Sequence, residues 1–236
     1  MPRINAQYNV ARPDSLPIRL ATRMRRVMYA SFIRLQSPDA TTTILDVGAT
    51  SDETYDSSNY LERWYPHPAM ITACGIDDAS FLELKYPGMK YRQYDGRELP
   101  FPDQSFDIVH SSAVLEHVGS RERQTWFVRE LLRVARKGVF FTTPNRWFPV
   151  EFHSVLPLVH WLPPPMFRAA LRALGHDALA LEENLNLLSA AEVVAICRSI
   201  DPASLPVIEL PRLFGWPSNI VCSLRRSLPH AFVGAA

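Results

Sequence analysis

Polar residues stand at the ends of several apolar runs, where they could bind a common ligand. They are Asp46 and Gly48, Asp77 and Asp78, Asp95 and Gly96, and His110, Ser111 and Ser112. A carboxylate offers acceptor oxygens for ribose hydroxyls or for an adenine amine, and a neighbouring glycine lets a flat base approach the backbone. Each aspartate alone is more typical of a helix cap or a turn. Their order along the chain nevertheless favours a nucleoside-like ligand.

The elements that would position these residues alternate between strand and helix. Apolar, β-branched runs predict strands at 43–48, 71–77, 89–95, 105–110, 139–143, 207–210 and 219–224. Helices are expected at 78–84, capped by Asp78, and from Ser120 to a stop at Gly138, with Trp126 and Phe127 facing inward. Ser189 and Glu192 form a capping box for a helix through Ile200. This order predicts an α/β fold with a doubly wound, mostly parallel sheet of about seven strands and helices on both faces.

Several of these stretches together resemble a known family. Residues 44–48, 75–78, 95–107 and 113–118 look like successive motifs of the class I S-adenosylmethionine-dependent methyltransferases. The stretch LPFPDQSFDIVHSSAVLEHV, 99–118, is the most specific and resembles the small-molecule type 11 branch. The similarity covers roughly 43–143. The resemblance implies a Rossmann-like fold and S-adenosylmethionine as the cofactor.

The same resemblance implies roles for individual residues. Asp46 and Gly48, with Ala49 and Thr50, would shape the loop around the cofactor's methionine part. Asp77, with Asp78 beside it, would hold the ribose, and Asp95 with Gly96 the adenine. Ser111 and Ser112 would line the methyl-transfer end, where Glu116 and His117 occupy the family's Glu-His position.

The first motif departs from the family pattern. One glycine, Gly48, is followed by Ala49, Thr50, Ser51 and Asp52 where the family has further glycines. Fewer glycines restrict positive φ and keep the backbone farther from a ligand. The acidic loop suits a sulfonium cation better than a pyrophosphate, which disfavours the alternative of a nucleotide-dependent oxidoreductase.

Proline, aromatic and polar residues gather after the fifth predicted strand, where substrate-specific structure would insert. Asn145, Trp147, Glu151 and His153 are the candidate substrate contacts. The alternative is a proline-stiffened loop that packs its aromatic rings into the core. His117 and then His153 are the candidate general bases, since histidine titrates near neutral pH. No His and carboxylate group shows ligand spacing along the chain, so no metal site is expected.

Composition and charge restrict the possible partners. The 236 residues carry 25 Lys and Arg against 24 Asp and Glu, so no bulk charge indicates nucleic acid. Three widely spaced cysteines predict buried free thiols and a cytoplasmic location. No signal peptide is evident, and no run approaches the roughly 20 apolar residues of a membrane span.

The chain reads as a single domain, 1–236, with an N-terminal helical segment at 1–40 and a Pro-rich insertion at 144–188. Arginines and apolar residues interleave over 15–36, which predicts a basic amphipathic helix. Packing of this helix on the main domain is favoured over contact with a membrane surface or an anionic partner.

The leading hypothesis is methyl transfer from S-adenosylmethionine to a small molecule or glycan precursor, with a hydroxyl favoured over nitrogen or carbon as the acceptor. The main rival is a non-catalytic binding or scaffold protein that keeps the fold but has a degenerate cofactor loop. The two differ in whether Asp77 and Asp95 face an open pocket or are covered by Tyr55, Trp64 or Tyr65.

Overall fold

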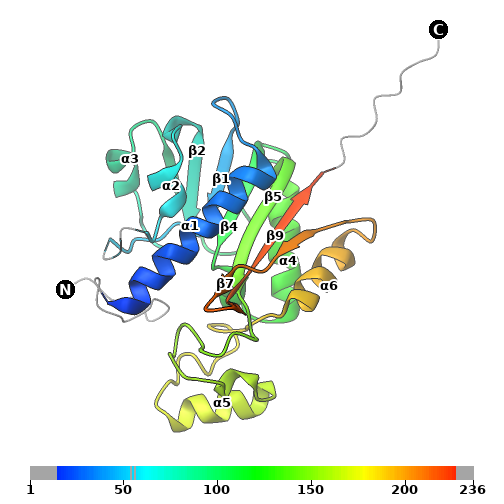
Figure 1. Ribbon diagram of the computed structural model, residues 1–236. Helices are drawn as coiled ribbons and strands as arrows, with labels where there is room; N and C mark the ends of the chain where they lie inside the picture. Colours follow the sequence, from blue (N-terminus) through cyan, green and yellow to red (C-terminus); the bar gives the residue numbers. More distant parts are fainter. Residues whose placement is uncertain (1–14, 54, 56, 227–236) are drawn as a thin grey trace.

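A seven-stranded sheet forms the centre of the molecule. The computed structural model describes residues 15–53, 55 and 57–226 (Figure 1). The strands run in the order β3-β2-β1-β4-β5-β9-β6. Neighbouring strands from β3 to β5 are parallel, whereas β9 is antiparallel to both β5 and β6. The strands are β1 (Ile44–Val47), β2 (Ile71–Gly75), β3 (Lys90–Gln93), β4 (Phe106–Ser112), β5 (Ala135–Pro144), β6 (Val207–Glu209) and β9 (Asn219–Arg225). The predicted Rossmann-like, mostly parallel sheet is confirmed.

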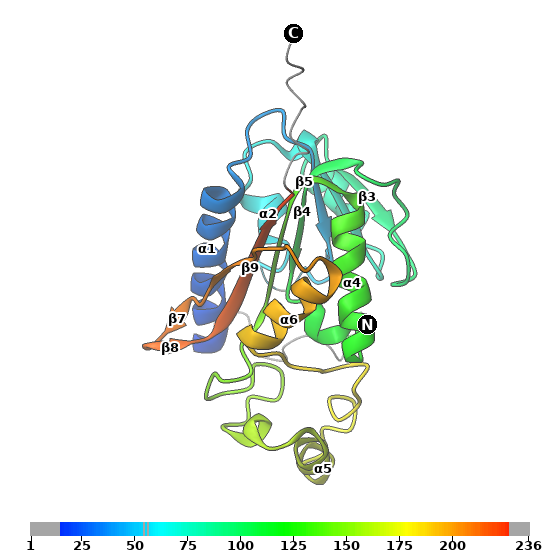
Figure 2. The ribbon, with the colours of Figure 1, turned by 90° about the vertical axis from the view of Figure 1, so that its right-hand side faces the viewer.

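Helices cover the sheet on both sides. The longer ones are α1 (Leu16–Gln36), α4 (Arg121–Val134), α5 (Pro164–Ala173) and α6 (Ala190–Ile200), and the short ones are α2 (Tyr60–Trp64), α3 (Phe81–Lys85), η1 (Pro68–Met70), η2 (Leu115–His117) and η3 (Val159–Trp161). Figure 2 shows α1 on one face of the sheet and α4 with α6 on the other. Helix α5 lies beyond one end of the sheet, and a small hairpin of β7 (Arg212–Leu213) and β8 (Trp216–Pro217) lies beside α1.

Neighbouring residues of the central strands pack against opposite helical layers. Phe140 lies against Phe32 of α1, with ring centroids 5.3 Å apart, while the next residue, Phe141, belongs to the core beneath α4 and α6. In β1, Ile44 likewise belongs to the core beneath α1, and Leu45 belongs to the core beneath α4 and α6. Side chains alternate between the two faces of a strand, so only a strand apolar at nearly every position can fill both layers.

Most element boundaries follow the predictions. Ser120 accepts a hydrogen bond from the backbone N–H of Arg123 and starts α4, and Ser189 and Glu192 form the expected capping box of α6. The N-terminal helix packs on the sheet through Met28 and Phe32, and its Met24 packs with Phe148 and Leu213. All three cysteines are buried and free. No helix within the described ranges is long and apolar enough to cross a bilayer.

Three local predictions are wrong. Gly138 does not stop α4, because that helix ends at Val134 and Gly138 lies inside β5, where a Cβ would come within 2.4 Å of Gln36 Oε1. Trp126 is 37% exposed and does not face inward. Asp78 does not cap α3: the N-cap is Ser80, and Asp78 Oδ1 accepts from its backbone N–H in a turn before the helix. The sequence pattern does not locate such element ends accurately, because the residue types that cap helices also occur in turns.

The buried carboxylate of Asp107 joins three strands near their amino ends. Its Oδ2 accepts from the backbone N–H and hydroxyl of Thr43, just before β1, and its Oδ1 contacts Arg136 Nη1 at 2.8 Å and Lys137 Nζ at 3.2 Å in β5. Burial alone would raise the pKa of Asp107, but these hydrogen bonds outweigh it and lower the pKa below its usual value.

We therefore expect Asp107→Asn to lower the free energy of unfolding at pH 7 by about 1.5 to 3 kcal/mol, as is usual for hydrogen bonds to charged groups. Because the folded-state pKa is depressed, this stabilisation is present above the unfolded-state pKa of about 4 and is lost as the pH falls through the folded-state value. Urea unfolding at several pH values checks this. Asp103→Asn, at a carboxylate 73% exposed beside Arg133, is the control and should change stability little.

Candidate cofactor and methyl-transfer site

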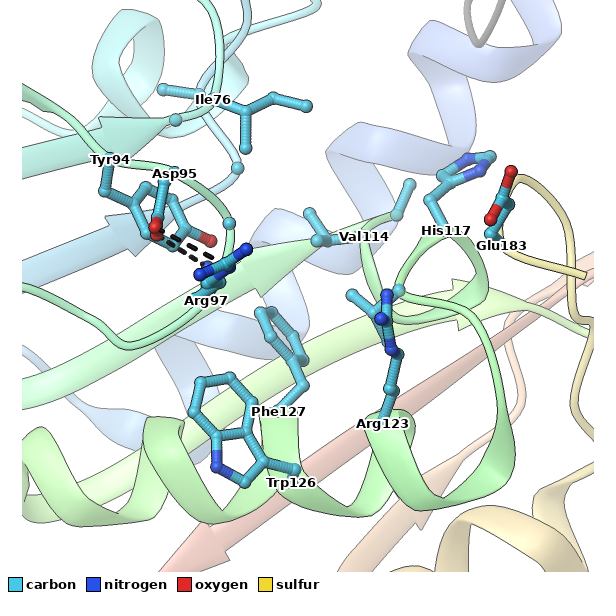
Figure 3. Close-up of a pocket in the computed structure, with 16 residues that line it drawn as sticks. Ile76, Tyr94, Asp95, Arg97, Val114, His117, Arg123, Trp126, Phe127 and Glu183 are labelled. Carbon is cyan, nitrogen blue, oxygen red and sulfur yellow. Dashed lines mark hydrogen bonds and ion pairs between the residues drawn. The ribbon is translucent and has the colours of Figure 1, made fainter.

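A cavity of about 740 Å³ opens at the carboxyl ends of the parallel strands (Figure 3). Its wall is formed by the residues that follow or end β1, β2, β3 and β4, together with one face of α4. They include Gly48 and Ala49, Gly75 and Ile76, Tyr94 to Arg97, Ala113 and Val114, and Arg123, Trp126 and Phe127. Ligands of doubly wound folds bind in this crevice. The cavity therefore has the position expected for a nucleoside-like cofactor.

The loop after β1 is held against β2 at two glycines. Gly48 has φ of +106°, and a Cβ there would come within 2.2 Å of Val114 Cγ2. The backbone N–H groups of Gly48 and Ala49 both donate to the carbonyl of Cys74. A Cβ on Gly75 would lie 2.2 Å from the carbonyl oxygen of Ala49. Backbone therefore approaches backbone here at a distance that a larger residue would prevent.

Asn59 supports the rest of this loop. Its side-chain Oδ1 accepts from the backbone N–H of Thr50, and its Nδ2 donates to the carbonyl of the same residue, both at 2.9 Å. Ser58 Oγ donates to Asp52 Oδ2 at 3.0 Å. The two hydrogen bonds of Asn59 thus fix the conformation of a loop that has no second glycine.

The predicted adenine residues lie in the cavity wall, and the predicted ribose residues lie beside it. Asp95 and Gly96 line the cavity, and Asp95 Oδ1 accepts from the backbone N–H of Arg97 at 3.0 Å (Figure 3). Asp77 is half-buried and follows the lining residue Ile76, but is not itself part of the wall. Asp78 is exposed, and its hydrogen bond from Ser80 lowers its pKa.

Tyr55, Trp64 and Tyr65, the residues that could have covered the aspartates, are not among those that line the cavity. Tyr65 and Trp64 pack instead beneath α1, in the core on the other side. The cavity at Asp95 is therefore open.

Several predicted cofactor residues face the interior instead of the cavity. Asp46 is buried with its Oδ1 2.5 Å from His110 Nδ1, and burial raises the pKa of Asp46 to about 6 while lowering that of His110 to about 4. Ser111 Oγ donates to the carbonyl of Val47, and Ser112 Oγ bonds Thr142 Oγ1. These side chains link neighbouring strands, and Thr50 is buried in the loop that Asn59 holds.

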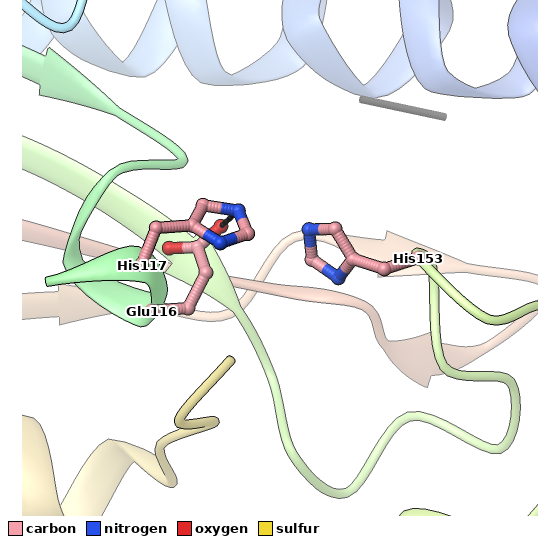
Figure 4. Close-up of side chains that lie close together, drawn as sticks. All are labelled: Glu116, His117 and His153. Carbon is pink, nitrogen blue, oxygen red and sulfur yellow. Dashed lines mark ion pairs between the residues drawn. The ribbon is translucent and has the colours of Figure 1, made fainter. Parts of the chain in front are cut away.

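The histidines proposed as bases lie together at one end of the cavity. His117, in η2 directly after β4, lines the cavity, and His153 comes from the segment after β5 (Figure 4). Their ring centroids are 4.7 Å apart. Glu116 is fully buried beside them and accepts from Thr143 Oγ1 at 2.9 Å. The ligand-capable atoms of Glu116, His117 and His153 all lie within 4.8 Å of one another.

Hydrogen bonds determine which nitrogen of each ring is free. His117 Nδ1 lies 2.6 Å from the carbonyl oxygen of Asn184, and His153 Nδ1 lies 2.6 Å from Glu151 Oε1. Since these oxygens only accept, both Nδ1 atoms carry the proton and both Nε2 atoms are left for other chemistry.

Burial lowers the pKa of His117, which keeps its ring neutral near pH 7. Burial would also lower the pKa of His153, but the hydrogen bond and charge of Glu151, together with the charge of Glu116, raise it above its usual value. The bond to His153 in turn helps to lower the pKa of Glu151 to about 2, against the effect of its burial.

The remaining predicted substrate residues have different surroundings. Asn145 is buried, donates to the carbonyl of Pro217 and accepts from the backbone N–H of Trp147. Glu151 is buried and accepts from the backbone N–H groups of His153 and Ser154. Trp147 is 51% exposed, with its ring 6.3 Å from that of Trp161.

Some lining residues were not predicted. Ile76 and Phe127 present apolar surface to the cavity, and Arg123 and Glu183 present charge. The spacing of Arg123, Trp126 and Phe127 places them on one face of a helix, which is a signal that a sequence can carry. Glu183 has no such signal, because it reaches the cavity from a loop between α5 and α6.

Comparisons with known proteins agree with this geometry. Residues 45–143 match the family model described as a methyltransferase domain. A probable S-adenosylmethionine-dependent methyltransferase of Mycolicibacterium smegmatis is 42% identical over 80 residues, which are 32% of this chain and 30% of that protein. Ajmaline N-methyltransferase of Rauvolfia serpentina is 30% identical over 141 residues, 56% of this chain and 45% of that protein. The chain thus matches less than a third of the length of the first of these relatives and less than half of the second.

A solved structure shares the fold. The S-adenosylmethionine-dependent methyltransferase from Mesorhizobium loti superposes with a TM-score of 0.54 at 16% identity, covering 84% of this chain and 98% of that one. The sheet order and the position of the cavity at its carboxyl edge are those of Rossmann-like folds. Within such a fold, residues 45–143 are similar to a methyltransferase domain, and the relative from Mycolicibacterium smegmatis and the structure from Mesorhizobium loti are S-adenosylmethionine-dependent methyltransferases by name.

The hydrogen bonds of Asn59 make its contribution testable. We expect Asn59→Ala to lower the free energy of unfolding by about 1 to 3 kcal/mol, because it leaves the buried backbone of Thr50 without partners. The same change should weaken binding of S-adenosylhomocysteine, since the loop then loses its fixed path. Urea unfolding and calorimetric titration measure the two effects. Ser58→Ala, which removes one bond to Asp52, is the matched control, and equal stability of the two variants would contradict the supporting role of Asn59.

Proposed function

We propose that this protein transfers the methyl group of S-adenosylmethionine to a small-molecule acceptor, most readily to a hydroxyl. The observation that carries the proposal is the open cavity at the carboxyl edge, which has Asp95 and Gly96 in its wall and His117 at one end. Apolar surface from Ile76, Val114 and Phe127 lies between them. The cavity thus combines polar groups for a nucleoside with an imidazole for the transfer step.

In this proposal the cofactor spans the cavity. Asp95, Gly96 and Ile76 would hold its adenine, Asp77 would bind its ribose, and the loop at Gly48 and Ala49 would hold its methionine part. His117 would then stand at the end where the methyl group is transferred. The loop's single glycine supports this path, because Gly48 has a positive φ and Val114 leaves no room for a Cβ there.

The chemistry is an in-line displacement. The acceptor oxygen forms a bond to the methyl carbon while the carbon–sulfur bond breaks, and S-adenosylhomocysteine leaves as a neutral thioether. A hydroxyl acceptor must also lose its proton, which passes to His117 Nε2. The carbonyl of Asn184 keeps the other nitrogen protonated, so this lone pair points away from Asn184 and remains basic. Alignment of the acceptor supplies most of the acceleration.

The segment after β5 would select the acceptor. His153 reaches the methyl-transfer end, and Trp147 offers a flat, half-exposed ring that suits a small molecule or a glycan precursor. Asn145 and Glu151 would act by fixing the conformation of this segment, since both side chains form hydrogen bonds with backbone groups. The relative from Rauvolfia serpentina is named for methylation of a nitrogen, so an amine is the second acceptor class to screen.

A non-catalytic binding protein is the second candidate function. The specific observation in its favour is the loop after β1, where Ala49 and Thr50 follow Gly48 and no second glycine lets the backbone approach a ligand closely. Calorimetric titration with S-adenosylmethionine and S-adenosylhomocysteine separates the candidates. Affinity near 1 μM, about −8 kcal/mol, supports the enzyme, and absence of binding supports the scaffold.

The ribose assignment can be tested at two adjacent carboxylates. We expect Asp77→Ala to weaken binding of S-adenosylhomocysteine by on the order of 1 to 3 kcal/mol, because hydrogen bonds to the ribose are lost. Asp78→Ala should weaken it less, since Asp78 is exposed and bonded to Ser80. Calorimetry on both variants, with the exposed and distant Asp201→Ala as control, gives the comparison. Unchanged affinity in the Asp77 variant would remove that residue from the site.

The role of His117 can be tested by separating binding from turnover. With an acceptor found by screening for S-adenosylhomocysteine release, His117→Gln should keep cofactor affinity within a few-fold while turnover falls by on the order of 10² to 10⁴. An acceptor with a more acidic hydroxyl should partly restore the rate, because it needs less help to lose its proton. A variant that turns over at the wild-type rate would exclude His117 as the base.

A further inference from the structure

Three side chains with metal-ligating atoms converge at one end of the cavity, although one of them, His153, is distant in sequence from the other two. Glu116 and His117 belong to η2, and His153 lies on the turn that follows Val150. Figure 4 shows the two imidazole rings facing one another with the Glu116 carboxylate beside His117. One oxygen and two nitrogens lie within 4.8 Å of each other. Two histidines and one carboxylate are a common ligand set for zinc and other divalent transition metals.

The second nitrogen of each ring is oriented as in known metal sites. His117 Nδ1 donates to the carbonyl of Asn184, and His153 Nδ1 donates to the buried carboxylate of Glu151. Metal-bound histidines usually donate their other N–H to a carbonyl or a carboxylate, which fixes the ring and makes the ligating nitrogen more basic. Both Nε2 lone pairs are thereby left for a common ligand.

Glu116 supplies the observation that points to a cation. Its side chain is fully buried, and Oε2 accepts from Thr143. Among the residues that the structure describes, Oε1 has no hydrogen-bond donor and lies 3.8 Å from His117 Nε2. A buried carboxylate oxygen without a donor costs free energy, and a cation placed between Oε1 and the two Nε2 atoms removes that cost.

We propose that Glu116, His117 and His153 bind a divalent transition-metal cation, with Zn²⁺ as the best match. Ligand atoms of a tetrahedral zinc ion with bonds of about 2.0 to 2.1 Å are about 3.3 Å apart, so the present positions, within 4.8 Å of one another, must close by up to about 1.5 Å. His117 also lines the cavity, so the fourth coordination position opens toward it. This is the arrangement of sites that keep one position for water or substrate.

The consequence for catalysis rests on the proposed function. While the cation is bound, the Nε2 lone pairs are engaged, and His117 no longer acts as the base. An acceptor hydroxyl bound at the open position instead has its pKa lowered by the metal and releases its proton to water. The binding of the cation does not depend on this step.

The experiment is a titration of tag-free, chelator-treated protein with Zn²⁺ by calorimetry and with Co²⁺ by visible absorption. One equivalent of each metal should bind per chain, and Co²⁺ should give the absorption of a low-symmetry, four-coordinate site. His153→Gln and Glu116→Gln should each weaken Zn²⁺ binding at least tenfold. Glu151→Gln, which keeps all three ligands but replaces the carboxylate that accepts from His153 Nδ1, should weaken it by on the order of 10- to 100-fold.

His67→Gln is the matched control, because His67 lies before η1 and outside the group of three. Its zinc affinity should equal that of the wild type. Thermal unfolding and S-adenosylhomocysteine titration of each variant show whether the fold and the cofactor cavity persist. Equal zinc affinity in the wild type and in His153→Gln would overturn the metal site while leaving the proposed methyl transfer intact. Loss of S-adenosylhomocysteine binding with retained zinc binding would instead contradict the proposed methyl transfer and leave the metal site intact.

Discussion

The close contact between the loop after β1 and the end of β2 is the constraint on which the site depends. The carbonyl of Ala49 passes Gly75 at a distance that excludes a Cβ, and Gly48 turns through a positive φ against Val114. Two backbone N–H groups then reach the same carbonyl, that of Cys74. Because this loop, the end of β2 and the segment after β4 meet here, the cavity wall is continuous across three strands. Its shape is a property of the backbone more than of any one side chain.

A network of buried hydrogen bonds lies behind that wall. Asp46, His110 and Tyr60 form a buried chain of hydrogen bonds beneath α1, with His110 Nε2 3.0 Å from the hydroxyl of Tyr60. The helix itself is tied to the loop: Thr22 Oγ1 and Arg25 Nη1 both bond Ser57 Oγ. The N-terminal helix, the loop and the first strand therefore form one connected unit. A shift of α1 would therefore also displace the loop that the hydrogen bonds of Asn59 support.

The sequence predicts the fold better than it predicts which side chains reach the cavity. Alternating strands and helices, with caps at Ser120 and Ser189, were sufficient for the sheet and most of its boundaries. Asp46, Ser111 and Ser112 stand at strand ends as expected, yet each bonds a neighbouring strand. Successive residues of a strand point to opposite faces, so a position at the end of a strand does not determine which way a side chain points. Asp95 and Gly96 follow their strand in a loop and do reach the wall.

The meeting of His117 and His153 could not be read from spacing, because it depends on how the segment after β5 folds back over η2. That division of the site between two segments has a consequence for how its specificity can change. The residues along the proposed cofactor path follow the strands of the sheet or lie on α4, whereas His153 and Trp147 belong to the segment after β5. The later part of that segment has its own apolar cluster of Phe167, Leu171 and Leu185, and its earlier part packs through Phe148 on Met24 of α1 and Leu213 of β7. An exchange of that segment for another would replace the partner of His117 and the surface offered to the acceptor, while the nucleoside half of the site remained as it is. Under the proposed function, the half of the site that would hold the methyl donor could therefore stay constant while the half that would bind the acceptor changed.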